Sequence, residues 1–209
     1  GHVYKKNSNG ITELYYSHLP DVDGHTPYIW SDVYYFENII KQLVKNGDKV
    51  VEVCSGPNII VPLILKRLDL TVEYYSIGSD INHLAQQREG VDYPIISVYG
   101  DATELPLKDK SVDLYIGHHA INDIWLTKGM QGVERSYEEM DRVLKASGYI
   151  IQSDCVLQHD TRVGDPSTKM VSLESLKLFS NEFNYNYKLE NGGELDWFIA
   201  SKEKIEIED

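Results

Sequence analysis

The chain has 209 residues and a formal net charge of -13. This length fits one α/β domain, so we expect a single domain over residues 1–209. Nucleic acids and anionic membranes are bound through clustered Lys and Arg side chains, and the acidic balance therefore argues against both as partners. No apolar run approaches the roughly 18 residues of a membrane span, and no basic segment followed by an apolar one opens the chain.

The two cysteines, Cys54 and Cys155, stand far apart in the sequence. They provide neither a disulfide framework nor the spacing of a metal site. A reducing environment is the default for such a chain, so we expect a cytoplasmic protein without a bound metal.

Residues 3–30 are polar and aromatic, are interrupted by proline and glycine, and show no clean period. They are either a surface segment whose rings pack on the edge of the domain or a lid over a ligand site. The next segment favours the lid. Ser31 is a suitable N-cap for an amphipathic helix that ends at Asn46–Gly47 and leads directly into an apolar strand.

Residues 49–65 are the stretch around which the chain is organised. Val50, Val51 and Val53 predict a buried parallel strand, which is followed by a glycine-containing turn and an apolar helix with Pro62 near its first turn. At Gly56 a side chain would strike a ligand that passes over the backbone, and Asn58 tolerates a left-handed conformation. The alternative is a turn that merely closes a strand–helix unit.

A second strand is predicted over residues 71–79, with Asp80 at its carboxyl end. A carboxylate there can accept hydrogen bonds from two ribose hydroxyls. Alternatively, Asp80 caps the helix that starts near Asn82. A third strand over residues 95–99 follows and is closed by Gly100-Asp101-Ala102.

Three motifs resemble those of class I S-adenosylmethionine-dependent methyltransferases. The turn Glu52-x-Cys54-x-Gly56-x-Asn58 resembles the family's acidic-x-Gly-x-Gly-x-Gly signature. Residues 99–120, YGDATELPLKDKSVDLYIGHHA, are similar to a run in which G-D-A-x-x-L-P precedes an apolar strand that begins with Asp. Residues 142–154, RVLKASGYIIQSD, resemble a helix end, a turn at Ser147–Gly148 and a fifth strand.

The resemblance implies a doubly wound α/β fold with a seven-stranded, mostly parallel sheet and a C-terminal antiparallel hairpin strand. It also implies S-adenosylmethionine as the cofactor. Asp101 would accept a hydrogen bond from the adenine amino group, and the Ala102 N–H would meet an adenine ring nitrogen. The expected cofactor-binding residues are Glu52, Cys54, Gly56, Asp80, Ile81, Asp101, Ala102 and His118.

The C-terminal part of the chain agrees with this topology. Ser172 can cap a helix, and residues 185–201, with a turn at Asn191-Gly192-Gly193, read as a β-hairpin. We therefore expect a Rossmann-like core over residues 31–200, followed by a charged, solvated tail over residues 201–209.

The acceptor side rests on the chemistry of methyl transfer, which needs a desolvated nucleophile close to the methyl carbon. We expect His119 as a base and Asp123 as a group that orients the acceptor, although each histidine can equally be an ordinary hydrogen-bonded side chain. Tyr28, Trp30 and Trp125 are the expected acceptor contacts. The pocket would lie between residues 1–30 and a loop over residues 119–136.

These patterns predict an enzyme that methylates a small molecule. One alternative is a peptide or protein side-chain methyltransferase, which would need an open groove. Another is a non-catalytic domain that binds S-adenosylmethionine, because Cys54 and Asn58 replace two glycines of the signature. The Asn/Asp-Pro-Pro-aromatic motif of adenine and cytosine amino-methyltransferases is absent from residues 117–120.

Overall fold

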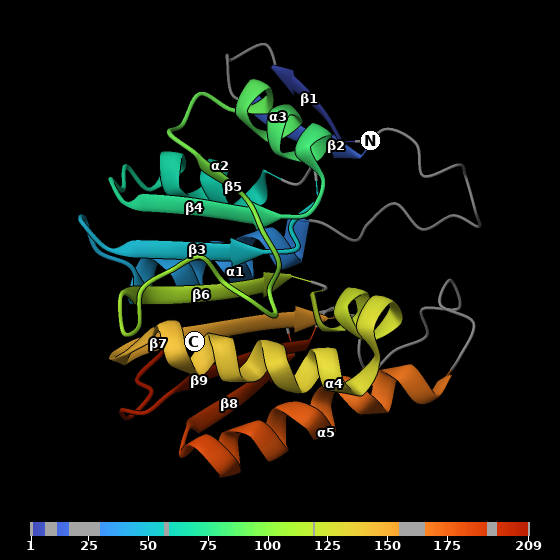
Figure 1. Ribbon diagram of the computed structural model, residues 1–209. Helices are drawn as coiled ribbons and strands as arrows, with labels where there is room; N and C mark the ends of the chain where they lie inside the picture. Colours follow the sequence, from blue (N-terminus) through green and yellow to red (C-terminus); the bar gives the residue numbers. More distant parts are fainter. Residues whose placement is uncertain are drawn as a thin grey trace.

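A seven-stranded sheet forms the centre of the molecule (Figure 1). The computed structural model describes residues 2–6, 12–16, 30–56, 59–118, 120–154, 166–191 and 196–208. In chain order the strands of the sheet are β3 (Lys49–Val53), β4 (Glu73–Gly78), β5 (Ile96–Tyr99), β6 (Val112–His118), β7 (Leu144–Asp154), β8 (Asn186–Asn191) and β9 (Asp196–Ser201).

The spatial order of the strands is β5-β4-β3-β6-β7-β9-β8. Neighbours from β5 to β7 pair in parallel, whereas β9 pairs antiparallel with both β7 and β8. The predicted fold, a mostly parallel seven-stranded sheet with an antiparallel C-terminal hairpin strand, is therefore confirmed.

Helices cover both faces of the sheet (Figure 1). They are α1 (Trp30–Leu43), α2 (Ile60–Arg67), α3 (Ile81–Gly90), α4 (Ala120–Val143) and α5 (Pro166–Phe183). The side chains of β3 alternate between the two apolar cores, because Val50 packs with α1 and α2 while Val51 and Val53 pack with α4 and α5. A strand covered on both faces has no solvated side, which explains why residues 50–53 of β3 are all buried.

The start of α1 lies toward the carboxyl edge of the parallel strands. Its last residue, Leu43, leads to the amino end of β3 at Lys49, so the helix runs back along the sheet. Phe36 packs on Trp197 with ring centroids 4.8 Å apart, and Trp197 is the register partner of Ser153 near the end of β7. The backbone of Trp30, the first residue of α1, therefore lies near this edge; its ring and the whole of Tyr28 are outside the described residues.

The N-terminal segment contains two strands that the sequence did not predict. β1 (His2–Lys6) and β2 (Thr12–Tyr16) pair antiparallel as a separate two-stranded sheet. Each has only five residues, which is too short for a clear alternation to emerge from a segment rich in tyrosine and lysine.

Residues 120–143 form a helix where the sequence suggested a loop over residues 119–136. The helix is interrupted at Gly129, whose φ of 66° and ψ of -167° are not helical. The physical reason for the helix is apolar spacing on both sides of this kink, since the residues that face the core recur every three or four positions. They are Ile121, Ile124, Val133, Tyr137 and Met140.

Two further elements differ in detail from the prediction. α5 begins at Pro166, so Ser172 lies within the helix and is not its cap. The predicted turn at Ser147–Gly148 lies within β7, at a shift in its register with β6. Val112 pairs with Leu144, whereas Leu114 pairs with Tyr149. Proline in the first helical turn costs little, which favours the earlier start of α5.

The charged tail is attached to the domain, whereas the sequence suggested a solvated end. Ile205 and Ile207 pack against the apolar core under α1. The Glu208 backbone N–H donates to the Gln42 side chain (2.8 Å), and the Gln42 amide donates back to the Glu208 carbonyl (3.0 Å). Alternation of isoleucine with glutamate lets the tail bury one side and solvate the other.

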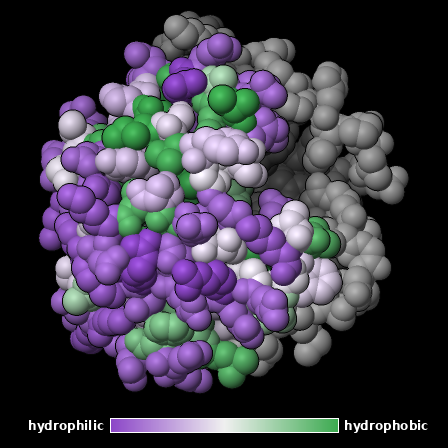
Figure 2. Space-filling model, viewed as in Figure 1, coloured by the Kyte–Doolittle hydropathy of each residue, from purple (hydrophilic) through white to green (hydrophobic). Residues whose placement is uncertain are grey.

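Much of the face seen in Figure 2 is hydrophilic. Among the helices of the described residues, none combines the length and the apolar character that crossing a bilayer requires.

Arg142, near the end of α4, binds the loop that follows β5 by hydrogen bonds to its backbone. Its guanidinium donates to both carboxylate oxygens of Glu139 (2.8 and 2.7 Å) and to the backbone carbonyls of Leu105 (2.9 Å) and Leu107 (2.8 Å). Glu139 is 4% exposed and accepts a third hydrogen bond from the Leu105 N–H (2.7 Å). A buried carboxylate with these partners ties residues 105–107 to the helix.

We expect Arg142→Met to lower the free energy of unfolding by about 2 kcal/mol, because it leaves the Glu139 carboxylate buried without its guanidinium. Arg135→Met is a matched control, since Arg135 contacts Glu138 and Glu139 from a side chain that is 56% exposed. Its expected effect is below about 0.5 kcal/mol. Urea unfolding of both variants measures the difference, and equal losses would contradict this role for Arg142.

Candidate cofactor and methyl-transfer site

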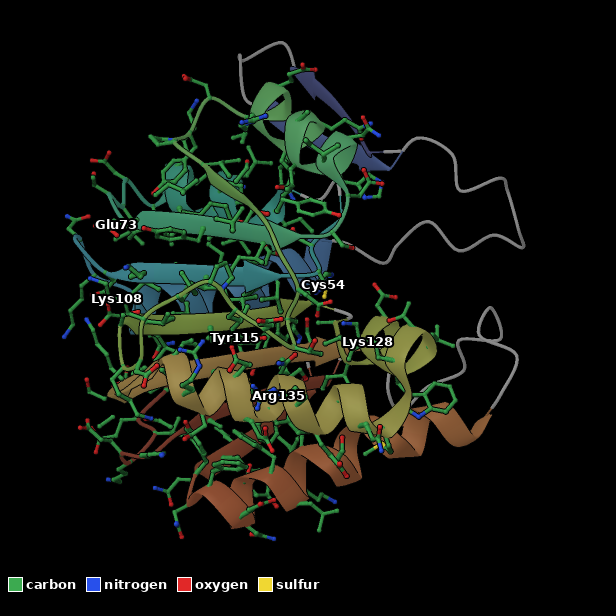
Figure 3. The ribbon with its side chains drawn as sticks, in the orientation of Figure 1. Cys54, Glu73, Lys108, Tyr115, Lys128 and Arg135 are labelled. Carbon is green, nitrogen blue, oxygen red and sulfur yellow. The ribbon has the colours of Figure 1, made fainter. Side chains whose placement is uncertain are left out.

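The candidate residues follow four neighbouring strands of the sheet at their carboxyl ends. In spatial order they are Asp101 after β5, Asp80 after β4, Cys54 to Gly56 after β3, and His118 at the end of β6. Figure 3 shows Cys54 and Lys128 at this edge. In open α/β sheets, ligands bind outside the carboxyl ends of the strands, so the topology brings the predicted cofactor residues to one crevice edge.

The turn after β3 has an unusual backbone. Cys54 and Gly56 both adopt a φ of 57°, in the left-handed region. For a residue with a side chain this conformation costs roughly 1–2 kcal/mol, so Cys54 holds it against its own preference. At Gly56 an added Cβ would meet no described atom within 4 Å, which leaves room for a ligand over the backbone. Asn58, the residue expected to tolerate this conformation, is outside the described residues.

Glu52 is buried under the turn, with 2% of its surface exposed. It lies on the α1 and α2 face of β3, where the Tyr74 hydroxyl donates a hydrogen bond to its carboxylate. Burial raises the pKa of Glu52 to about 7, against the opposing effect of the Tyr74 hydrogen bond. In this structure Glu52 therefore supports the strand end from within the core.

Asp80 is the N-cap of α3, which the sequence offered as the alternative to a ribose contact. One carboxylate oxygen accepts from the backbone N–H groups of Asn82 (2.8 Å) and His83 (3.4 Å). The Asn82 hydrogen bond is the main reason that the pKa of Asp80 is lowered. The side chain is 47% exposed, so the ionised carboxylate still has lone pairs for a ligand, and the neighbouring Ile81 is 66% exposed.

Asp101 is held by its own loop and by α4. One oxygen accepts from the Thr103 N–H and hydroxyl (both 2.8 Å), and the other is paired with the Lys128 ammonium. Burial opposes ionisation of Asp101, but Lys128 and Thr103 together lower its pKa. Ala102 beside it is 5% exposed. The sequence pattern did not reveal Lys128, because no helix was predicted around it.

His118 belongs to a row of side chains across three strands. Its Nδ1 lies 2.6 Å from the Ser153 hydroxyl, and its ring stacks at 6.5 Å on Trp197. His118 pairs with Ser153 in the β6–β7 register, and Ser153 pairs with Trp197 in the β7–β9 register. Ser153 and Trp197 were not predicted as site residues, and strand register is the signal that places them beside His118.

The acceptor-side residues lie at the start of α4. Asp123 is exposed, while Trp125 is partly buried against the apolar core. Burial, then the charges of Asp123 and Asp101, raise the pKa of the Cys54 thiol to about 12. The structure thus brings Asp123 and Asp101 close enough to Cys54 to affect its ionisation. His119 is outside the described residues.

We expect the contribution of Glu52 to the stability of the wild-type protein to fall as the pH rises from about 5 to about 7, and then to level off. The reason is that the folded pKa of Glu52, about 7, lies above the ordinary value of 4.5, so ionisation is costly only in the folded state. Glu52→Gln removes this titration. Its stability relative to wild type should increase by as much as about 3 kcal/mol between pH 5 and pH 8.

Urea unfolding at four pH values measures this change. Glu134→Gln, on an exposed position of α4, is the control and should follow the wild-type curve. Parallel curves for Glu52→Gln and wild type would show that burial does not control this carboxyl group.

Comparisons with known proteins agree with this geometry. Residues 51–152 match the family model described as a methyltransferase domain. A methyltransferase from Aquifex aeolicus, described as dependent on S-adenosylmethionine, superposes with a TM-score of 0.60 at 17% identity, covering 81% of this chain and 96% of its own. A search of curated proteins found no match.

Two other solved structures share the fold while carrying larger chains. The CMeT domain of citrinin polyketide synthase has a TM-score of 0.63 at 14% identity, covering 83% of this chain and 52% of its own. The phosphoethanolamine N-methyltransferase 2 of Haemonchus contortus, solved with phosphomonomethylethanolamine and S-adenosylhomocysteine, has a TM-score of 0.60 at 14% identity, covering 84% and 53%. The family model identifies residues 51–152 as a methyltransferase domain, and the motifs, the strand order and the solved structures agree with the fold of the class I S-adenosylmethionine-dependent methyltransferases.

Proposed function

We propose that this protein transfers the methyl group of S-adenosylmethionine to a small-molecule acceptor. The observation that carries the proposal is the order of side chains along the carboxyl edge of the sheet. Asp101 after β5 would hold the adenine, Asp80 after β4 the ribose, and the turn after β3 the methionyl group. The methyl group would then point toward the end of β6, where His118 lies.

The residues present fit this cofactor. No described atom lies within 4 Å of a Cβ added at Gly56, the Asp80 carboxylate is ionised and half-exposed, and Ile81 offers exposed apolar surface beside it. Bound there, S-adenosylmethionine supplies a methyl group activated by its sulfonium. Two ribose hydroxyls can donate to Asp80, and the adenine amino group can donate to Asp101, because a carboxylate accepts several hydrogen bonds.

On the acceptor side, we assign His119 as the base and Asp123 as the group that orients or neutralises the acceptor. Ser153 holds the His118 ring through the 2.6 Å contact, so His118 is fixed where the cofactor and the acceptor would meet. A histidine near neutrality can take a proton from an acceptor, while an exposed aspartate suits a cationic amine. Trp125 would add an aromatic wall.

The choice of a small acceptor rests on the N-terminal segment. α1 starts near the carboxyl edge, so residues 1–29 precede a helix whose first turn is already beside the site. Tyr28 and Trp30 would then cover the cofactor and exclude water. The Haemonchus contortus structure supports this only as a precedent, since its fold accommodates phosphomonomethylethanolamine together with S-adenosylhomocysteine.

Asp80→Asn separates the two roles of Asp80. Asparagine is a good N-cap, so we expect thermal stability within about 2 °C of wild type, but its one oxygen is used by the cap and cannot also accept from the ribose. Affinity for S-adenosylhomocysteine should fall at least about tenfold, corresponding to roughly 1.5–3 kcal/mol. Asp92→Asn, at a fully exposed aspartate paired with Lys66, is the control.

Calorimetric titration measures both variants. Unchanged affinity in folded Asp80→Asn would remove Asp80 from the ribose site.

Methyl-donor consumption tests the acceptor class. Wild-type protein should consume S-adenosylmethionine with the low-molecular-weight fraction of a cell extract and not with the dialysed protein fraction. Deleting residues 1–29 should reduce this turnover more than it weakens cofactor binding, because the segment acts on water exclusion and not on the adenosine contacts. Consumption only with the protein fraction would favour a protein acceptor, and binding without any consumption would favour a non-catalytic domain.

A further inference from the structure

Gln87 is a buried side chain that holds the turn after β3 by hydrogen bonds from a neighbouring helix. It lies on α3, is 1% exposed, and donates both N–H bonds of its amide to the turn. One goes to the Gly56 carbonyl (2.7 Å) and the other to the Ser55 hydroxyl (2.7 Å). Ser55 in turn lies 3.1 Å from the Ser76 hydroxyl on β4, so the turn is tied to a helix and to a second strand.

The turn needs such external support because its own sequence does not favour its shape. Cys54 adopts the left-handed conformation without being glycine. Strained backbone of this kind persists only where the surroundings over-determine it. The two hydrogen bonds from Gln87 act on the residues that directly follow Cys54.

The Gln87 amide is kept at a cost. Its carbonyl oxygen is buried without a hydrogen-bond partner among the described residues. A buried acceptor left in this way costs about 1–3 kcal/mol, and an apolar side chain would avoid that cost. The two hydrogen bonds that the amide donates offset this cost, because they give the Ser55 hydroxyl and the Gly56 carbonyl of the turn a donor.

The same helix carries the proposed ribose contact. Asp80 caps α3, and Gln87 lies seven positions later, about 10 Å along the helix axis. Through α3, the carboxylate that would hold the ribose and the amide that shapes the turn are therefore parts of one rigid element.

We propose that Gln87 is a positioning residue for the methionyl end of S-adenosylmethionine, acting through the turn at Cys54 to Gly56. This inference rests on the proposed function, which places the methionyl group over that turn. Both hydrogen bonds that the Gln87 amide donates within the described part of the chain go to the turn, so loss of the amide should affect ligands that have a methionyl group and spare those that end at the thioether.

The test compares two ligands that share an adenosine. S-adenosylhomocysteine carries the amino acid portion, whereas 5′-methylthioadenosine lacks it. Calorimetric titration of Gln87→Met should show affinity for S-adenosylhomocysteine reduced about tenfold and affinity for 5′-methylthioadenosine changed by less than about threefold. Gln86→Met, at an exposed position of the same helix, should change neither affinity.

Two further variants keep the test decisive if Gln87→Met does not fold. Gln87→Glu preserves the side-chain shape but cannot donate both hydrogen bonds, and Ser55→Ala removes one of the two acceptors; both should lose affinity for the same ligand selectively. Equal loss for the two ligands, or no loss, in folded variants would overturn the positioning role. Wild-type protein that binds neither ligand would instead overturn the proposed function, and the inference with it.

Discussion

The parallel arrangement of β5, β4, β3 and β6 is the constraint on which the site depends. Parallel strands end at the same edge, so the loops that follow them lie in a row in the order of the sheet and not of the chain. Asp101 and Asp80 flank the β3 turn on one side, and His118 lies on the other. An extended cofactor with adenine, ribose and methionyl parts could span such a row of loops.

Side chains from the covering helices then hold these loops in place. Arg142 and Glu139 of α4 hold the loop after β5, and Lys128 of the same helix pairs with Asp101. Gln87 of α3 holds the turn after β3. The apolar packing of the helices fixes their positions, and the hydrogen bonds of the buried Gln87 and Glu139 gain strength because they form where water is largely excluded.

The electrostatics of this edge follow from the acidic character of the whole chain. Asp80, Asp101 and Asp123 lie along it, and the buried Glu52 lies beneath it. On the proposed placement, the three aspartates favour a cationic sulfonium over the neutral thioether that remains after transfer. Lys128 offsets part of this negative field beside β5, because its ammonium is paired with Asp101.

The sequence by itself determined the fold and the places in it of the candidate cofactor residues that belong to local motifs. Apolar residues along β3, glycine at position 56 and acids at strand ends are local signals, and together with the family resemblance they predicted a mostly parallel seven-stranded sheet with Asp80 and Asp101 after two of its strands. Only the tertiary structure showed Lys128 beside Asp101, Gln87 on Gly56 and Ser153 on His118, which are 27, 31 and 35 positions apart. Such contacts depend on how helices and strands pack, and no local period encodes packing between distant elements.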